Sequence, residues 1–269
     1  MENRRIVHDI GISYDDCGEG PAVLLVHGFP LNRQMWQAQV APVAQAGYRV
    51  ITPDLRGFGA SYAPPDGYSI DVFADDLIAL LDALDIQRAA VCGMSMGGYI
   101  LLDLLERYPQ RVSAAGFIAT KSSADDEAGR ARRSAMAAQA ETFGASPIIK
   151  NFAELLFAPE TMHSNPELIA QVTSWMRATP PSALAGGLLA MRDRKDYTPL
   201  LPGFPHPSLV IVGSEDRAAS HTAIDLFNAG LPSCQSHVIV GAGHMVNMEK
   251  PGEFNQVLIG FLKSIRDSL

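Results

Sequence analysis

The chain has few cysteines, and their number limits how it can be stabilised. Among 269 residues there are three, Cys17, Cys92 and Cys234, an odd number with no Cys-x-x-Cys pair. Secreted proteins that depend on disulfides usually carry an even set of cysteines, and structural zinc sites are usually marked by closely spaced pairs. The sequence therefore predicts neither a disulfide framework nor a metal site, and it favours a reducing compartment, by default the cytoplasm.

Long apolar runs and dense basic clusters are also missing. Residues 1–10 lack the apolar core of a signal peptide, and no other run approaches the roughly 20 apolar residues that a membrane-spanning helix requires. The most basic stretch, residues 129–133, lies in an alanine-rich helical pattern, which favours a solvated helix face. Together with a formal net charge of −8, these features predict a protein without a nucleic-acid or membrane partner.

Apolar residues make up 47% of the chain and form short runs separated by helical patterns. An alternating stretch, residues 6–14, is typical of an outer antiparallel strand, and the continuous apolar runs after it are typical of strands buried on both faces. These runs span residues 22–26, 48–52, 89–93, 114–119, 208–213 and 236–240, and the clearest helical patterns span residues 71–84, 96–107 and 251–265. The alternation predicts an α/β fold with a mostly parallel sheet and helices on both faces.

One segment, residues 121–197, breaks this alternation because it contains four helical patterns and no strand-like run. An insertion that keeps secondary structure of its own is typical of a lid or a binding element. We therefore expect a helical cap at residues 121–197, inserted into a core formed by residues 1–120 and 198–269.

The sequence Gly-Met-Ser-Met-Gly at residues 93–97 places a hydroxyl in the turn between a buried strand and a helix. A turn this sharp strains the backbone of the serine and leaves room only for glycine two residues to either side. The strain raises the hydroxyl above the sheet, next to the free N–H groups at the start of the helix. A chance match to a short pattern is the alternative, but the strand and helix around it favour Ser95 as a catalytic nucleophile.

A serine nucleophile needs a base, and the base needs an acid that orients it. His244 is the best candidate for the base, because it lies in a glycine-containing loop between the last predicted strand and the last helix. The acid should precede the histidine in the chain, and Asp216 directly follows a buried strand. Glu215 is the competing carboxylate, and the shorter side chain of Asp216 is favoured at this turn.

The loop after the first buried run supplies a candidate for half of an oxyanion hole. It reads His-Gly-Phe-Pro at residues 27–30, and we expect the backbone N–H of Phe29 to act together with that of Met96. The histidine of this loop, His27, is interpreted as a hydrogen-bonded residue that shapes the backbone and not as a base.

In the cap, apolar residues recur at helical spacing around Trp175 and Met176. Packing between cap helices is the favoured interpretation of such a stripe, but a cap must also cover the substrate. Trp175 and Met176 are therefore candidates for substrate binding in a small, largely apolar pocket. A charged substrate would need a cationic anchor, for which Arg177 and Arg192 are available, although solvent exposure is favoured for both.

These motifs, taken in order, resemble those of the α/β-hydrolase superfamily along essentially the whole chain. The matching segments read HGFP, PDLRGFGAS, GMSMGG, GSEDR and GAGHMVNMEKP. The helical cap and the TPLL segment before the run SLVIVG are similar to the branch that contains 3-oxoadipate enol-lactonases and small carboxylesterases. The resemblance implies an eight-stranded sheet, a triad of Ser95, Asp216 and His244, an oxyanion hole at Phe29 and Met96, and no cofactor.

The same resemblance implies hydrolysis of a small carboxylic ester or lactone through a serine acyl-enzyme. Relatives that hydrolyse haloalkanes or epoxides have aspartate at the nucleophile position, so Ser95 sets those reactions aside. Cleavage of carbon–carbon bonds and formation of peracids use the same triad and stay open, as does a ligand receptor with slow turnover. The sequence does not predict the oligomeric state.

Overall fold

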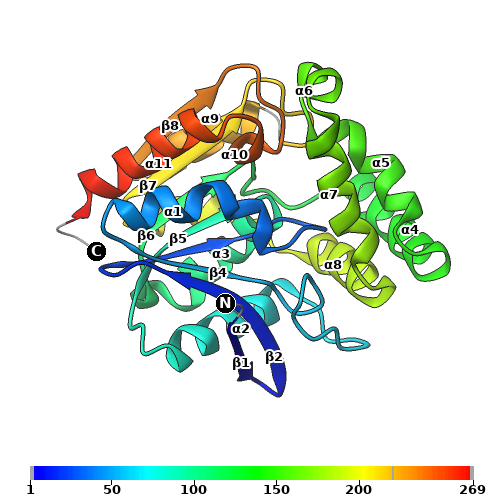
Figure 1. Ribbon diagram of the computed structural model, residues 1–269, viewed down its shortest axis with the longest axis horizontal. Helices are drawn as coiled ribbons and strands as arrows, with labels where there is room; N and C mark the ends of the chain where they lie inside the picture. Colours follow the sequence, from blue (N-terminus) through cyan, green and yellow to red (C-terminus); the bar gives the residue numbers. More distant parts are fainter. Residues whose placement is uncertain (1–2, 220, 267–269) are drawn as a thin grey trace.

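The computed structural model describes residues 3–219 and 221–266, and its centre is an eight-stranded sheet (Figure 1). The strands lie in the order β1-β2-β4-β3-β5-β6-β7-β8. β1 pairs antiparallel with β2 and β2 antiparallel with β4, while every later pairing is parallel, as the sequence predicts. In chain order, β1 to β8 span Asn3–Val7, Ile10–Cys17, Ala22–Val26, Arg49–Pro53, Ala89–Met94, Val112–Ile118, Ser208–Gly213 and Cys234–Ile239.

The central strands are buried on both faces, as their continuous apolar sequences predict. Successive side chains of β3 point to opposite faces, so Leu24 and Val26 join one apolar cluster while Val23 and Leu25 join the other. The first cluster includes residues of α2, α3 and α9, and the second includes residues of α1 and α11. Two layers of helices therefore enclose the sheet (Figure 1).

The helices outside the cap begin close to the residues that the hydrophobic spacing predicts. α3 spans Met96–Arg107, and α2 spans Ile70–Ala83, where the side chain of Ser69 caps the first turn. α11 spans Pro251–Ser264 and has its proline in the first turn. α1, α9 and α10 span Gln37–Gln45, His221–Gly230 and Val246–Glu249, and short 3₁₀ helices span Arg33–Trp36, Pro109–Arg111 and Thr198–Gly203.

The N-terminal region differs from the prediction of a single outer strand. β1 and β2 form a hairpin joined by His8 and Asp9, whose φ angles are 46° and 62°. A two-residue connection with positive φ at both positions matches the twist of antiparallel strands. His8 and Asp9 lack the glycine that usually marks this turn, so the sequence pattern alone does not reveal it.

Between β6 and β7 the chain forms five α-helices and one short 3₁₀ helix, where the sequence predicts four helices. The unpredicted α-helix is α6, whose six residues are too few to show a helical repeat. α4 packs against α8, and α5 packs against both α4 and α7. The helices α4 to α8 span Glu127–Phe143, Ser146–Leu156, Pro159–Ser164, Pro166–Ala178 and Pro181–Asp193, and they lie together at one end of the sheet (Figure 1).

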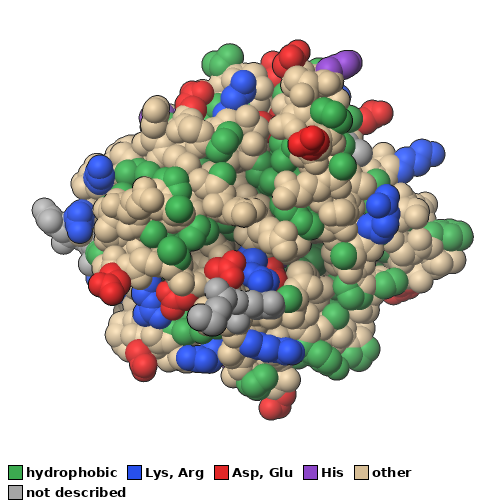
Figure 2. Space-filling model, in the orientation of Figure 1, with side chains coloured by type: hydrophobic (Ala, Val, Ile, Leu, Met, Phe, Trp, Pro, Cys, Tyr) green, Lys and Arg blue, Asp and Glu red, His purple; other side chains and the backbone are tan. Residues whose placement is uncertain are grey.

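None of the helices in the described part of the chain is both long and apolar enough to cross a membrane. On the face shown in Figure 2, acidic and basic side chains are scattered among apolar ones. The cytoplasmic location, and the division of the chain into core and cap at residues 121 and 197, stay predictions.

Candidate active site

Ser95 occupies a strained position between β5 and α3. Its backbone angles are φ 53° and ψ −111°, a region that residues other than glycine rarely adopt. Such a conformation costs on the order of 1–3 kcal/mol and persists only where neighbouring groups hold it. Here Ser95 N donates to Ile118 O at 2.9 Å, and Thr120 Oγ1 donates to Ser95 O at 2.8 Å. The serine is therefore held by the end of the adjacent strand, β6, and by the residues that follow it.

The glycines of the Gly-Met-Ser-Met-Gly motif are required by close backbone contacts. A Cβ atom on Gly93 would lie 2.1 Å from the carbonyl oxygen of Gly97. A Cβ atom on Gly97 would lie 2.5 Å from the carbonyl oxygen of Val26 on the neighbouring strand, β3. No side chain fits at either position without moving the backbone. For Gly93 the clash lies across the turn, as expected, whereas Gly97 is limited by the neighbouring strand.

His244 and Asp216 form a buried pair beside this turn. The imidazole Nδ1 lies 2.9 Å from Asp216 Oδ2 and 3.0 Å from Oδ1, and the two residues are 5% and 8% exposed. Asp216 Oδ1 also accepts the backbone N–H groups of Ala218 and Ala219 at 2.8 and 2.9 Å. Burial alone would raise the pKa of Asp216, but the charge and hydrogen bond of His244 and the two backbone N–H groups outweigh it and lower this pKa.

The protonation of the pair follows from these contacts. An ionised carboxylate only accepts hydrogen bonds, so Nδ1 of His244 carries a hydrogen and donates it to Asp216. In the neutral ring, Nε2 is then left as an acceptor. The competing carboxylate, Glu215, is exposed and does not contact the imidazole. Of the two candidate acids, the structure brings Asp216 to the histidine.

Glu249, which is not among the predicted site residues, holds the His244 loop against the cap. Its Oε1 accepts the N–H of Gly243 at 2.8 Å, while its Oε2 accepts the N–H of Ala158 at 2.9 Å and the hydroxyl of Thr161 at 2.6 Å. These cap partners are far from Glu249 in the chain, so no local pattern marks the interaction. One carboxylate thus links the residue before His244 to the start of α6.

Both predicted oxyanion-hole residues lie next to Ser95. Met96 is the first residue of α3, where a backbone N–H has no acceptor within the helix. Phe29 follows β3 in the loop, is joined to Pro30 by a cis peptide bond, and its ring lines the same cavity as Ser95. Neither N–H donates a hydrogen bond to another group of the described chain. Their role in holding an oxyanion stays a prediction.

His27 shapes the loop, as expected. Its Nε2 accepts the N–H of Leu55 at 3.0 Å, so its Nδ1 carries the hydrogen that is donated to Gly28 O at 2.9 Å. Complete burial lowers the pKa of His27, although the nearby charge of Asp54 raises it in part. A neutral imidazole with both nitrogens hydrogen-bonded to backbone is structural.

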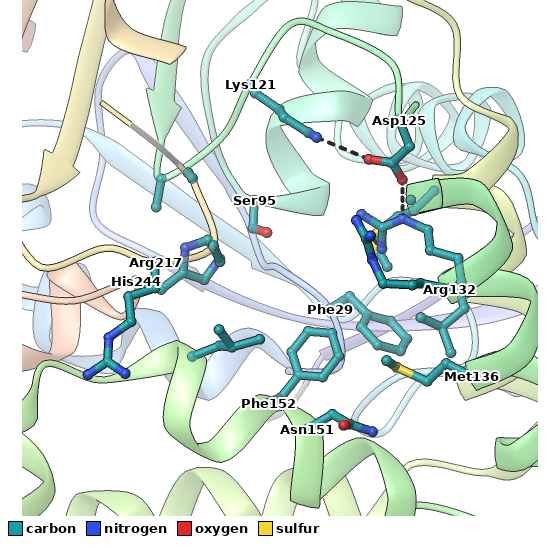
Figure 3. Close-up of a pocket in the computed structure, with 18 of the residues that line it drawn as sticks. Phe29, Ser95, Lys121, Asp125, Arg132, Met136, Asn151, Phe152, Arg217 and His244 are labelled. Carbon is teal, nitrogen blue, oxygen red and sulfur yellow. Dashed lines mark hydrogen bonds and ion pairs between the residues drawn. The ribbon is translucent and has the colours of Figure 1, made fainter. Parts of the chain in front are cut away.

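A cavity of about 400 Å³ opens at Ser95 and His244 (Figure 3). Its apolar lining consists of Phe29, Tyr99, Met136, Phe152, Leu188 and Met191. Its polar and charged lining includes Lys121, Asp125, Arg132, Arg133, Asn151 and Arg217. In Figure 3, Ser95 lies between His244 and Arg217 on one side and Arg132 on the other. No hydrogen bond joins Ser95 to His244 in the described chain, so the hydroxyl is free to meet a ligand in this cavity.

The cap residues lie where the favoured interpretation puts them, in the packing between cap helices or at the surface, and not at Ser95. Trp175 and Met176 do not line the cavity with Ser95: Met176 is buried in an apolar cluster, and Trp175 borders a separate cavity of about 270 Å³. The reason is that α7 packs on α5 and α6, while α4, α5 and α8 supply the cap side of the lining. Arg177 is exposed outside this cavity, and Arg192 pairs with Asp193 at 2.6 Å.

The expected character of the pocket also needs correction. Residues 130–132 are exposed, as expected for a solvated helix face, but Arg132 and Arg133 also line the cavity. The apolar residues of α4 are mostly alanines, so the helix pattern did not show which side of it faces the core. The cavity therefore combines the expected apolar side chains with several cationic groups that the prediction of a largely apolar pocket did not include.

Comparisons with known proteins agree with this fold. The family profile described as the alpha/beta hydrolase fold matches residues 21–251. A putative non-heme chloroperoxidase of Synechocystis is 33% identical, over 94% of this chain and 95% of its own length. 3-Oxoadipate enol-lactonase 2 of Acinetobacter baylyi is 30% identical, over 95% and 94%. A thermophilic esterase from Thermogutta terrifontis, solved with malate bound, superposes with a TM-score of 0.94 at 31% identity, over 98% and 99%.

Proposed function

The chain belongs to the α/β-hydrolase family and is a hydrolase, and from this premise we propose that it cleaves a small carboxylic ester or lactone through a serine acyl-enzyme. One observation carries the proposal. A strained serine and an imidazole oriented by a buried carboxylate open to the same cavity. Groups in these three roles are the elements of nucleophilic acyl transfer.

In the proposed first step, Ser95 Oγ attacks the carbonyl carbon of the ester while His244 Nε2 takes the hydroxyl proton. The imidazolium that forms is stabilised by Asp216, which stays ionised because of its lowered pKa. The carbonyl oxygen becomes an oxyanion, for which the N–H groups of Met96 and Phe29 are the proposed donors. The intermediate then collapses, the C–O bond to the alcohol breaks, and His244 returns the proton to the leaving oxygen.

In the proposed second step, water replaces the alcohol. His244 takes a proton from the water as its oxygen attacks the acyl carbon, and collapse of the second intermediate releases the acid and restores the Ser95 hydroxyl. For a lactone, the alcohol produced in the first step stays attached to the acyl chain, so a single hydroxy acid leaves. The names of the esterase and enol-lactonase relatives support this choice of bond.

The similarity to a putative non-heme chloroperoxidase favours a second candidate function. If hydrogen peroxide replaces water in the second step, the acyl-enzyme yields a peroxycarboxylic acid and free serine. This reaction needs the same three residues and adds only a peroxide co-substrate. Product analysis with and without hydrogen peroxide distinguishes the two functions, because only one of them forms the peracid.

The proposed function can be tested without knowledge of the natural substrate. The protein is incubated with a fluorophosphonate, which labels activated serines covalently, and is assayed on a panel of p-nitrophenyl esters and lactones. We expect labelling at Ser95, loss of the label in Ser95→Ala, and turnover of at least one short ester. Labelling of another residue, or equal turnover by Ser95→Ala, contradicts the proposal.

A further inference from the structure

We propose that the cavity selects esters or lactones that carry a carboxylate, and that Arg132 and Arg217 hold this anionic group. The inference rests on the proposed function for the identity of the scissile bond.

The charge of the cavity is opposite to that of the whole molecule. The chain carries a formal net charge of −8, yet the charged residues that line the cavity, apart from His244, are Lys121, Arg132, Arg133, Arg217 and the carboxylate Asp125. Four cations thus face one anion. A concave site with charges of one sign concentrates its field and attracts small ions of the opposite sign.

Asp125 does not neutralise Arg132 or Arg217, because its carboxylate is already bound to three other cations. Lys121 Nζ lies 3.0 Å from Asp125 Oδ1, Arg194 donates to the same oxygen at 2.7 Å, and Arg133 Nε donates to Oδ2. Burial would raise the pKa of Asp125, but the hydrogen bonds and charges of Arg194 and Arg133 hold it far below its ordinary value. The carboxylate is therefore already bound to three cations.

Arg132 and Arg217 remain without an acidic partner in the described part of the chain. Both residues are exposed. Arg130, two residues before Arg132 on α4, differs because it points out of the cavity and pairs with Asp193 at 3.3 Å. The two unpaired guanidinium groups in the cavity are thus available to a ligand.

The backbone positions of the two arginines place them around the reacting serine. Arg217 directly follows Asp216, so its Cα is fixed relative to the acid of the catalytic pair. Arg132 lies on α4, across the cavity from His244, with Ser95 between them (Figure 3). A carboxylate matches the fork of a guanidinium, and charge-assisted bonds of this kind are about twice as strong as neutral ones. The volume of about 400 Å³ suits a small substrate.

Pairs of substrates with the same shape but different charge test whether the cavity recognises the carboxylate. Monomethyl glutarate and methyl 5-amino-5-oxopentanoate have the same length, but the first ends in a carboxylate and the second in a neutral amide. O-Acetylglycolate and O-acetylglycolamide make the same comparison on the alcohol side of the ester. We expect kcat/KM for the anionic member of at least one pair to exceed that for the neutral member by about tenfold, and the ratio to fall with added salt.

Variants then assign the preference to residues. Arg132→Gln and Arg217→Gln should each lower the ratio of anionic to neutral kcat/KM by roughly threefold to tenfold. Arg130→Gln removes the same charge from the same helix outside the cavity and should leave the ratio unchanged. A wild-type ratio of one or less in both pairs, or equal ratios in all three variants, would overturn the inference.

A binding measurement keeps this inference distinct from the proposed function. Glutarate is titrated calorimetrically into Ser95→Ala and into the same protein with Arg132→Gln or Arg217→Gln added. Binding that weakens in the double variants, without hydrolysis of any ester by the wild type, would support anion recognition and contradict the proposed function. Hydrolysis of neutral esters without anionic preference or glutarate binding would contradict the inference alone.

Discussion

Replacing Asp216 with asparagine tests the proposed role of the His244 pair at almost constant volume. Asp216 Oδ1 accepts two backbone N–H groups, from Ala218 and Ala219, and Oδ2 lies 2.9 Å from His244 Nδ1. In Asp216→Asn the amide oxygen must stay with the two backbone donors. The amide NH₂ then faces Nδ1 and donates to it, which moves the imidazole hydrogen to Nε2. In that tautomer the ring cannot take a proton from Ser95.

The size of the effect follows from the cost of the alternative orientation. Flipping the amide would restore the correct tautomer, but it would leave two N–H donors facing the NH₂ group. Each unsatisfied buried donor costs about 1–3 kcal/mol, so the flip costs about 2–6 kcal/mol. At about 1.4 kcal/mol per factor of ten, kcat/KM should fall by roughly 30-fold to 10⁴-fold. Binding of substrate should change little, because Asp216 does not line the cavity.

The assay is steady-state hydrolysis of the best ester from the p-nitrophenyl panel, together with thermal unfolding of each protein. Glu215→Gln is the matched control, since it removes the neighbouring exposed carboxylate that competed for the role of the acid. We expect wild-type activity from the control. A folded Asp216→Asn that keeps more than about a third of the wild-type kcat/KM, or a larger loss in Glu215→Gln, would refute the reasoning.

The contacts of Ser95, Glu249 and Asp216 also predict how substitutions and pH change activity and stability. Ser95→Ala should lower kcat by about 10⁴-fold or more with little change in melting temperature, and a folded variant with a tenth of wild-type activity would require another nucleophile. Glu249→Gln should lower kcat, because the NH₂ group of the new amide must face the N–H of either Gly243 or Ala158. An unchanged kcat would show that these hydrogen bonds of Glu249 are not needed for activity. The lowered pKa of Asp216 stabilises the fold above about pH 4, and this stabilisation is lost as the carboxylate becomes protonated in acid. In urea unfolding, the free energy of unfolding should therefore fall more steeply with decreasing pH below about pH 5 in wild type than in Asp216→Asn. Equal slopes in the two proteins would contradict this.

Local sequence determined most of the secondary structure and identified the candidate catalytic residues. β7 at Ser208–Gly213 and α3 at Met96–Arg107 have the predicted bounds, because apolar spacing reports which side chains a strand or helix buries. The turn at Ser95 could be predicted because its glycines are demanded by atoms within a few residues or on the next strand. The pairing of His244 with Asp216 could be predicted from chain order and the ends of buried strands.

Tertiary structure alone decided what surrounds those groups. Glu249 meets Ala158 and Thr161 only because the cap folds back on the last loop, and no pattern near Glu249 encodes that approach. Arg132 belongs to an alanine-rich helix that looks solvated in sequence, and it faces the cavity because α4 packs against α8 and α5. Spacing along one helix shows which residues share a face, but the packing of distant helices determines what that face meets. The candidate catalytic residues could therefore be predicted from the sequence, while the charge of the cavity beside them could not.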